Sequence, residues 1–139
     1  AAPNHVRREG DGAWRRASFG RWLPLALDEP ALHLTAHEAQ AWCRWAGRRL
    51  PTEHEWSLAA RDPRLAWGQV WEWTASPFEP FPGFEPHAYR DYSQPWFDGR
   101  PVLKGGSFAT AAFMKHPRYR NFFQPHRNDA FAGFRSCAV

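Results

Sequence analysis

The chain of 139 residues has a formal net charge of +4 at pH 7 and a mean hydropathy of −0.67. No stretch approaches the length of a transmembrane helix, so we expect no membrane partner. The 18 Lys and Arg residues are scattered along the chain, so we expect no nucleic-acid partner either. Nine Trp, eleven Phe and thirteen Pro residues are typical of a compact domain whose aromatic side chains pack across long loops.

The two cysteines, Cys43 and Cys137, lie far apart and are too few for a disulfide framework. A reducing compartment is the simpler interpretation, so we expect a cytoplasmic protein. Cys43 falls on an apolar helical stretch, where a free cysteine behaves as a small hydrophobic residue. We therefore predict that Cys43 belongs to the core.

The first 30 residues contain three short segments with strand character, separated by glycines. These segments are residues 6–8, 14–16 and 21–23. They are consistent with a hairpin whose partner strands lie upstream of the sequence.

Two helix starts follow from capping residues. Thr35 with Glu38, and Thr52 with Glu55, each form the S/T-x-x-E capping box. Apolar residues recur after each box at the helical period. The predicted helices cover residues 36–46 and 53–61.

After Pro63 the sequence changes to short strands and loops. The predicted strands are residues 70–73, 102–108 with a bulge at its Gly-Gly pair, 118–123 and 131–137. A Pro/Phe/Gly loop over residues 75–88 and an irregular segment over 89–97 lie between them. The fold class predicted from these elements is α+β.

His33 and His37 invite a metal interpretation, because nearby histidines can ligate one ion. Thr35 is the predicted N-cap, however, so His33 precedes the helix and His37 lies in its first turn. The two imidazoles then do not share a helical face. We assign no metal ligand in this chain.

Tyr89 and Tyr92 lie three residues apart after a Pro/Gly loop, where both could face one cavity. A phenol can donate a proton or a hydrogen atom to an activated oxygen species. The alternative is that both rings are core residues with satisfied hydroxyl groups. The residues alone leave both interpretations open.

A third cluster lies within residues 118–127. Asn121 offers a donor and an acceptor, and Arg127 offers a planar fork for a carboxylate. Phe122 and Phe123 could wall a pocket for a quaternary ammonium group. The alternative is a structural pairing of arginine with a carboxylate beside the last strand.

Several segments resemble, in the right order, the hallmarks of formylglycine-generating-enzyme-like domains. They are the helix-to-helix run of residues 45–56, Val-Trp-Glu-Trp-Thr at 70–74, Leu-Lys-Gly-Gly-Ser-Phe at 103–108 and Gly-Phe-Arg at 133–135. The resemblance covers nearly all of residues 32–137. It implies a loop-rich, C-type-lectin-like α+β fold, with residues 1–139 forming one domain that is incomplete at its N-terminus.

Local residues separate two activities within this family. The formylglycine-generating oxidases use a pair of copper-binding cysteines shortly before the closing Gly-Phe-Arg, and residues 113–125 contain no cysteine. Residues 71–78, 82–84, 89–93 and 119–123 are instead similar to ergothioneine-type sulfoxide synthases. These enzymes join sulfur to trimethylhistidine (hercynine), and selenoneine-forming relatives take selenium from a selenosugar.

This resemblance implies roles for particular residues. Tyr89 would be the catalytic donor of a proton or hydrogen atom, and Tyr92 would help to line the trimethylhistidine pocket. Asn121, with the backbone of Phe122, would hold the carboxylate of the betaine. Arg127 would hold a carboxylate on the sulfur donor.

The resemblance also implies Fe(II), which these enzymes bind with three histidines on an N-terminal helical-bundle domain. That domain is missing from this sequence, so iron and the domain are expected as partners outside it. Relatives bind calcium around the Glu72 motif, but Gln69 stands where many have Asn.

The expected small-molecule partners are hercynine, O2 and a thiol or selenosugar donor. Phe123 stands where relatives that use γ-glutamylcysteine carry an acidic residue, which argues against a γ-glutamyl donor. A non-catalytic ligand-binding module is the competing hypothesis, because a C-type-lectin-like fold does not fix a function.

Overall fold

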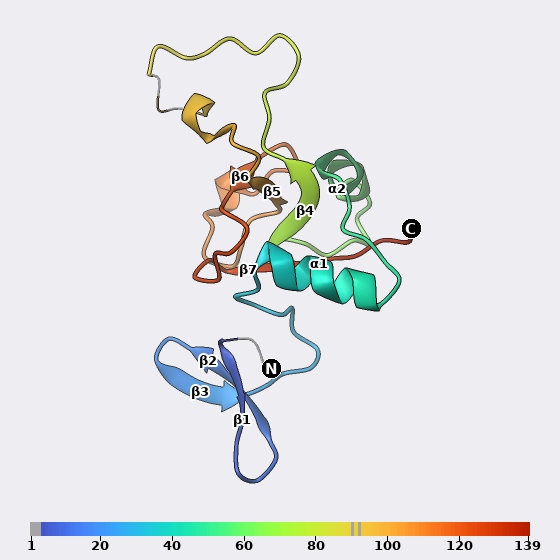
Figure 1. The fold of residues 1–139 in the computed structure, drawn as a ribbon, viewed down its shortest axis with the longest axis vertical. Helices are drawn as coiled ribbons and strands as arrows, with labels where there is room; N and C mark the ends of the chain where they lie inside the picture. The colour runs from blue at the N-terminus through green and yellow to red at the C-terminus, as the bar shows by residue number, and fades with distance from the viewer. Residues whose placement is uncertain (1–3, 90, 92) are drawn as a thin grey trace.

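The computed structural model describes residues 4–89, 91 and 93–139, and within them the chain forms two α-helices, two short 3₁₀ helices and seven strands. A small N-terminal sheet is joined by an extended connector to the main body, which holds both helices and a second sheet (Figure 1). The α+β class and the two predicted helices are confirmed. No helix among the described residues is long and apolar enough to cross a membrane.

The N-terminal sheet is antiparallel, in the order β1-β2-β3. Its strands are β1 (Val6–Arg8), β2 (Trp14–Ser18) and β3 (Arg21–Pro24). The three predicted segments are confirmed as strands, and they pair with one another, while the expectation of partner strands upstream stays a prediction. The β2–β3 turn places Phe19 and Gly20 at positive φ, so the phenyl ring of Phe19 lies at the tip of the hairpin.

Both helices begin at the predicted capping boxes. In α1 (Ala36–Trp45) the Glu38 amide donates to the Thr35 hydroxyl oxygen, and the Glu38 carboxylate accepts from the Thr35 amide. Helix α2 (Glu53–Ala59) repeats this arrangement. These reciprocal bonds satisfy backbone donors that a helix start leaves unpaired. Each helix ends one or two residues earlier than its periodicity suggested.

The main sheet has the order β6-β5-β4-β7, in which β4 and β7 are parallel and the other pairs are antiparallel. Its strands are β4 (Trp71–Pro77), β5 (Pro101–Lys104), β6 (Asn121–Phe122) and β7 (Ala132–Phe134). The predicted strand over 102–108 is wrong beyond Lys104. Gly105 and Gly106 both have positive φ, and this left-handed backbone turns the chain out of the sheet.

The core lies between α1 and the main sheet. It contains small residues of α1, Leu50 from the connection between the helices, and residues of β4, β5 and β7: Ala36, Ala39, Cys43, Leu50, Trp73, Leu103 and Ala132. The prediction that Cys43 is a core residue is confirmed. Gly133 allows the connector to cross β7, because a Cβ atom there would lie 2.3 Å from the Ala31 carbonyl oxygen.

A long loop leaves the end of β4 and projects from the body before it returns through the 3₁₀ helix η1 (Gln94–Trp96) to β5 (Figure 1). A second 3₁₀ helix, η2 (Ala112–Met114), lies between β5 and β6. Strand β6 is an edge strand of the main sheet, and its Phe122 stacks on Phe78 at the base of the long loop. This arrangement forms the candidate site.

Candidate functional site

An aromatic cleft of about 550 Å³ lies between the long loop and the segment that contains β6. Its lining residues are Phe78, Pro80, Phe81, Phe84, Asp91, Ser93, Trp96, Phe97, Arg118, Tyr119, Arg120, Asn121 and Phe122. This size and the mixture of aromatic walls with a few polar groups are typical of small-molecule sites. We refer to this site as the aromatic cleft.

Stacked rings build the walls of the aromatic cleft. Phe78, just after β4, stacks on Phe122 of β6 with ring centroids 4.1 Å apart, and it packs against Phe97 at 5.0 Å. Phe84 meets Phe97 edge-on at 5.4 Å. The Phe78 amide also donates to the Arg100 carbonyl oxygen at 2.7 Å, which fixes the base of the loop.

Strand β6 presents two of the predicted site residues to the cleft, Asn121 and Phe122. Asn121 pairs with Leu103 of β5, and Phe122 pairs with Val102. The Asn121 side-chain oxygen accepts the Phe122 amide hydrogen at 2.9 Å. The backbone amide expected to help hold a carboxylate is therefore engaged by Asn121 itself.

Arg120 fastens this segment to α2. Its Nη2 donates to Glu53 Oε1 at 2.8 Å, and its Nε lies 2.8 Å from Oε2. Its Nη1 donates to the Glu79 carbonyl oxygen at 2.9 Å, while the guanidinium lies over the rings of Phe78 and Phe81. Both charged side chains are largely buried, so the pair is a fixed part of the cleft floor.

Lys104 lies close to this pair as a fully buried lysine of β5. Burial lowers the pKa of its ammonium group to about 8, the Glu53 carboxylate opposes this, and the Arg120 guanidinium adds to it. The ammonium nitrogen also lies 5.9 Å from the centre of the Trp56 ring. The buried ammonium group of Lys104 thus lies beneath the cleft, although the family resemblance implies no role for it.

Glu72, which was considered for calcium, is already engaged. Its Oε2 accepts the Trp56 indole hydrogen at 2.7 Å, and both carboxylate oxygens pair with the Arg135 guanidinium. The pKa of Arg135 is raised by that bond. A carboxylate occupied in this way does not fit a calcium site.

Three predicted site residues lie outside the cleft lining. Tyr89, on the long loop, is 63% exposed, and its backbone amide donates to His87 Nδ1. The Arg127 guanidinium pairs with Asp129 at 2.5 Å and lies 4.9 Å from the centre of the Phe123 ring, which packs against the core. The Asp129 carboxylate raises the pKa of Arg127.

The structure therefore brings Asn121 and Phe122 together in the cleft and places Tyr89, Phe123 and Arg127 elsewhere. Tyr92 lies outside the described residues.

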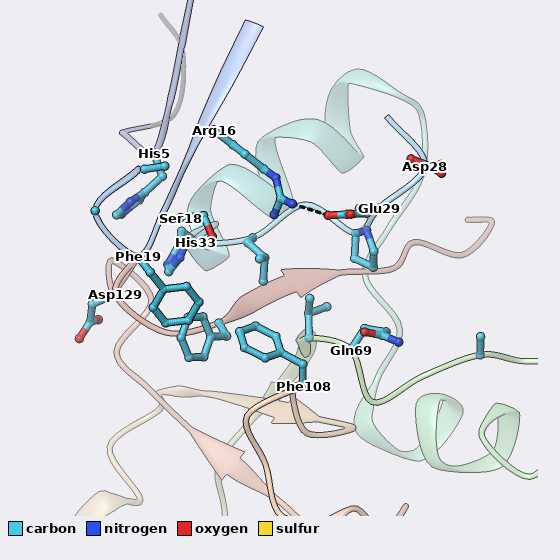
Figure 2. Close-up of a pocket in the computed structure, with 17 residues that line it drawn as sticks. His5, Arg16, Ser18, Phe19, Asp28, Glu29, His33, Gln69, Phe108 and Asp129 are labelled. Atoms are coloured by element: carbon cyan, nitrogen blue, oxygen red, sulfur yellow. Dashed lines mark ion pairs between the residues drawn. The ribbon is translucent and has the colours of Figure 1, made fainter. Parts of the chain in front are cut away.

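A second cavity, of about 910 Å³, lies between the N-terminal sheet and the main body (Figure 2). His5 stacks on His33 with ring centroids 4.3 Å apart, and His33 Nδ1 lies 3.1 Å from the Asn128 carbonyl oxygen. Burial, with a smaller contribution from His5, lowers the pKa of His33. Arg16 pairs with Glu29 at 2.7 Å, as the dashed line in Figure 2 shows.

Although this cavity is the larger one, we favour the aromatic cleft as the functional site. None of the described site residues predicted from the sequence lines the second cavity, and its polar groups largely pair with neighbouring protein groups. No group of three or more His, Cys, Asp or Glu residues in the described part of the chain is arranged to hold a metal ion. These residues therefore do not fit an iron site.

Several residues that shape the cleft were not predicted from the sequence. Phe81, Trp96 and Phe97 were assigned only to irregular loop, although the density of aromatic residues there was a usable signal. The roles of Glu53 and Arg120 depend on a contact across 67 residues. Spacing along the sequence carries no signal for such a pair.

A family model described as the sulfatase-modifying factor enzyme 1-like domain matches residues 5–67 and 64–138. Hercynine oxygenases of Mycolicibacterium thermoresistibile and Mycobacterium tuberculosis are 38% and 36% identical to this chain over 170 positions. These matches cover 86% and 89% of the chain, but it spans only 38% and 40% of those relatives. Ergothioneine biosynthesis protein 1 of Schizosaccharomyces pombe is 38% identical over 85 positions, which cover 59% of this chain and 11% of that protein.

The alignment also reveals a difference in length. The match to the first hercynine oxygenase extends over 170 positions, and it includes 86% of the 139 residues of this chain, or about 120. About 50 of the aligned positions therefore have no counterpart in this chain. The two pieces of the family match meet at residues 64–67, in the short connection from α2 to β4. Ala66, Gln69 and Val70 of this connection border the second cavity. With the family model covering residues 5–138 in two pieces, the chain belongs to the sulfatase-modifying factor enzyme 1-like family.

Proposed function

We propose that this chain is the substrate-binding and catalytic-tyrosine domain of an oxygen-dependent, non-haem iron enzyme. The enzyme would form a carbon–sulfur or carbon–selenium bond on trimethylhistidine (hercynine), in biosynthesis of the ergothioneine or selenoneine type. The similarity to hercynine oxygenases over 86% of the chain is the observation that carries this proposal. The aromatic cleft supports it, because its chemistry suits a betaine.

A betaine joins a quaternary ammonium group to a carboxylate, and the cleft offers partners for both. Aromatic faces such as those of Phe84 and Phe97 attract quaternary ammonium groups. Asp91 places a carboxylate among the lining residues. Asn121 offers its side-chain amide hydrogens, since its oxygen is used by the Phe122 amide. We propose that these groups orient trimethylhistidine in the cleft.

Tyr89 is the proposed donor of a proton or hydrogen atom. It lies on the loop that forms one wall of the cleft, and its side chain is exposed. A phenol can donate a proton or a hydrogen atom during oxidation. Tyr92 remains a proposed contact to the betaine. Arg127 remains a proposed contact to the sulfur or selenium donor.

Iron would be held by a further domain, because the described residues of this chain do not form a site for it. When bound there, iron(II) would supply oxygen activation. This chain would bind the organic substrate, orient it and hold the proton of Tyr89. The donor is proposed to be a thiol or a selenosugar without a γ-glutamyl group, since Phe123 is apolar and packs on the core.

A non-catalytic binding module is the second candidate function. It is favoured by one observation, which is that the cleft already combines aromatic faces with polar groups such as Asp91 and Asn121. Such a cleft can bind a ligand without help from another domain. This candidate predicts binding of the betaine without turnover.

An activity assay separates the two candidates. The full-length protein containing this chain would receive iron(II), O2 and trimethylhistidine, with cysteine, γ-glutamylcysteine or a selenosugar in parallel. Mass spectrometry should detect a sulfur or selenium adduct with one donor. Tight betaine binding with no adduct from any donor, in protein verified to contain iron, would favour the binding module.

A further inference from the structure

We infer that Arg118 is the carboxylate-binding residue of the aromatic cleft. This inference rests on the proposed function and deepens it, because it identifies which charged group holds the anionic end of the substrate. Nothing in the sequence comparison or in the family pattern assigns this position a role.

Two arginines beside the cleft are already neutralised. Arg100 donates to both carboxylate oxygens of Asp98, at 2.8 and 2.7 Å, and it lies over the Trp96 ring at 4.9 Å. Arg120 is paired with Glu53 and lies over two phenylalanine rings. Both guanidinium groups are therefore used in fixing the walls, and neither has its fork free for a ligand.

Arg118 differs from both. Arg118 lines the cleft and is exposed, and within residues 4–89, 91 and 93–139 its guanidinium has no hydrogen-bond or ion-pair partner. Its backbone is nevertheless well fixed. The Arg118 amide donates to His116 Nδ1 at 3.1 Å, and the neighbouring Pro117 carbonyl accepts from the Ser57 hydroxyl of α2 at 3.1 Å. The structure thus presents an unpaired guanidinium from an anchored backbone.

The chemistry of the neighbouring groups favours a carboxylate as the ligand of this guanidinium. The backbone amide of Phe122 is engaged by the Asn121 oxygen, which leaves the Asn121 amide hydrogens as the neutral donors on β6. A carboxylate can accept two parallel bonds from a guanidinium fork and a third from an amide. A ligand with an ammonium group alone would instead meet the positive charge of Arg118. The anionic end of a betaine is the group that fits.

Binding measurements test this inference without requiring turnover. Trimethylhistidine, and its analogue with a primary amide in place of the carboxylate, would be titrated calorimetrically into the anaerobic full-length protein. We expect Arg118→Gln to weaken betaine binding by about tenfold to a hundredfold, the loss typical of a charged hydrogen bond. The amide analogue should bind wild type and variant equally weakly. Arg118→Lys, which keeps the charge but loses the fork, should be intermediate.

Arg44→Gln is the matched control, because it removes an exposed positive charge from the last turn of α1, away from the cleft lining. It should bind the betaine like wild type. Equal betaine affinity in wild type and Arg118→Gln, with product formation intact, would overturn the role of Arg118 and leave the proposed function standing. If wild type itself does not bind the betaine, the proposed function fails, and the role of Arg118 fails with it.

Discussion

Glu53 and Arg120 are 67 residues apart in the sequence, yet their side chains meet at 2.8 Å beneath the aromatic cleft. Glu53 is the first residue of α2, and Arg120 directly precedes the β6 residues that face the cleft. The pair therefore connects the start of α2 to the strand that presents Asn121. Both side chains are largely buried. If one partner is removed, water therefore cannot solvate the charge that remains.

Glu53→Gln is predicted to destabilise the fold by about 3 to 5 kcal/mol, as expected when one partner of a buried ion pair is removed. It leaves Arg120 without a compensating charge and removes the carboxylate that favours the charged form of Lys104. Urea unfolding would measure the loss. The double variant with Arg120→Met should recover part of it, because no unpaired guanidinium then remains.

Asp62→Asn is the control for this experiment. It breaks the Arg64–Asp62 pair, whose arginine side chain is 88% exposed. Ion pairs in water contribute little to stability, so no measurable change is expected. If Glu53→Gln were as mild as Asp62→Asn, the buried pair would not be holding the cleft floor in place.

Lys104 predicts a pH dependence of stability. Burial brings the pKa of its ammonium group to about 8, compared with 10.5 for an ordinary lysine. Between these values the unfolded chain binds more protons than the folded one, so the free energy of unfolding should rise with pH from about 8 to 10.5. This lowering of the Lys104 pKa corresponds to about 3 kcal/mol. At neutral pH the buried, charged ammonium group destabilises the fold by about that amount.

Lys104→Met should remove this cost, since a buried charge is replaced by an apolar side chain of similar length. We expect the variant to be more stable than wild type at pH 7, and the difference should shrink as pH approaches 10.5. Urea unfolding of both proteins at several pH values between 7 and 10 would measure this. A constant difference across that range would show that Lys104 keeps its ordinary pKa in the fold.

The sequence was sufficient for the local features. Thr35 and Thr52 each fix a helix start through a bond to a glutamate three residues later, and such short-range chemistry is visible in the chain itself. The strand ending at Lys104 was harder to predict. The Gly-Gly pair after it was consistent with a bulge, and only the positive φ of both residues shows that the chain leaves the sheet.

The site was only partly predictable, for a different reason. Asn121 and Phe122 lie on a strand whose register places them at the cleft, and their binding role stays a prediction. Arg127 was expected to bind a ligand, but in the structure its fork is taken by Asp129, two residues away. The sequence alone had left open that an arginine here pairs with a carboxylate for structural reasons, and Arg127 makes such a pair with Asp129. Pairing of this kind depends on side-chain geometry, which spacing alone does not determine.

The stacked pair of His5 and His33 predicts that the N-terminal sheet responds to acid. Burial and the neighbouring His5 lower the pKa of His33, while the carbonyl groups of Asn128 and Ala130 and the carboxylate of Asp129 oppose this. The folded contact therefore prefers neutral His33. Its stabilising effect is present above about pH 6.5 and is lost as pH falls below that value.

Hydrogen exchange would detect this loosening. Protection factors of the β1–β3 amides should fall from pH 7.5 to pH 5.5, whereas those of β4 and β5 should change less. The variant His5→Phe keeps a ring stacked on His33 but removes the neighbouring imidazole. Its β1–β3 amides should retain more protection at pH 5.5 than those of wild type. Unchanged protection in wild type would contradict the prediction.

Tyr89→Phe tests the proposed catalytic role, because it removes one hydroxyl group from an exposed ring and leaves the walls of the cleft intact. General acid catalysis is worth about 10² to 10⁴ in rate, so we expect turnover to fall by at least 10²-fold or the product to change. The dissociation constant of trimethylhistidine should remain within about twofold of wild type, a free-energy change well below 1 kcal/mol. Single-turnover kinetics and calorimetry would measure the two quantities separately.

Tyr89→Leu, which also removes the ring, distinguishes the hydroxyl group from the ring as a packing element. If the phenol is the donor, the two variants should lose turnover to a similar extent, because both lack the proton. A structural tyrosine would give the opposite pattern. Phe would then behave like wild type, and Leu would weaken betaine binding together with turnover.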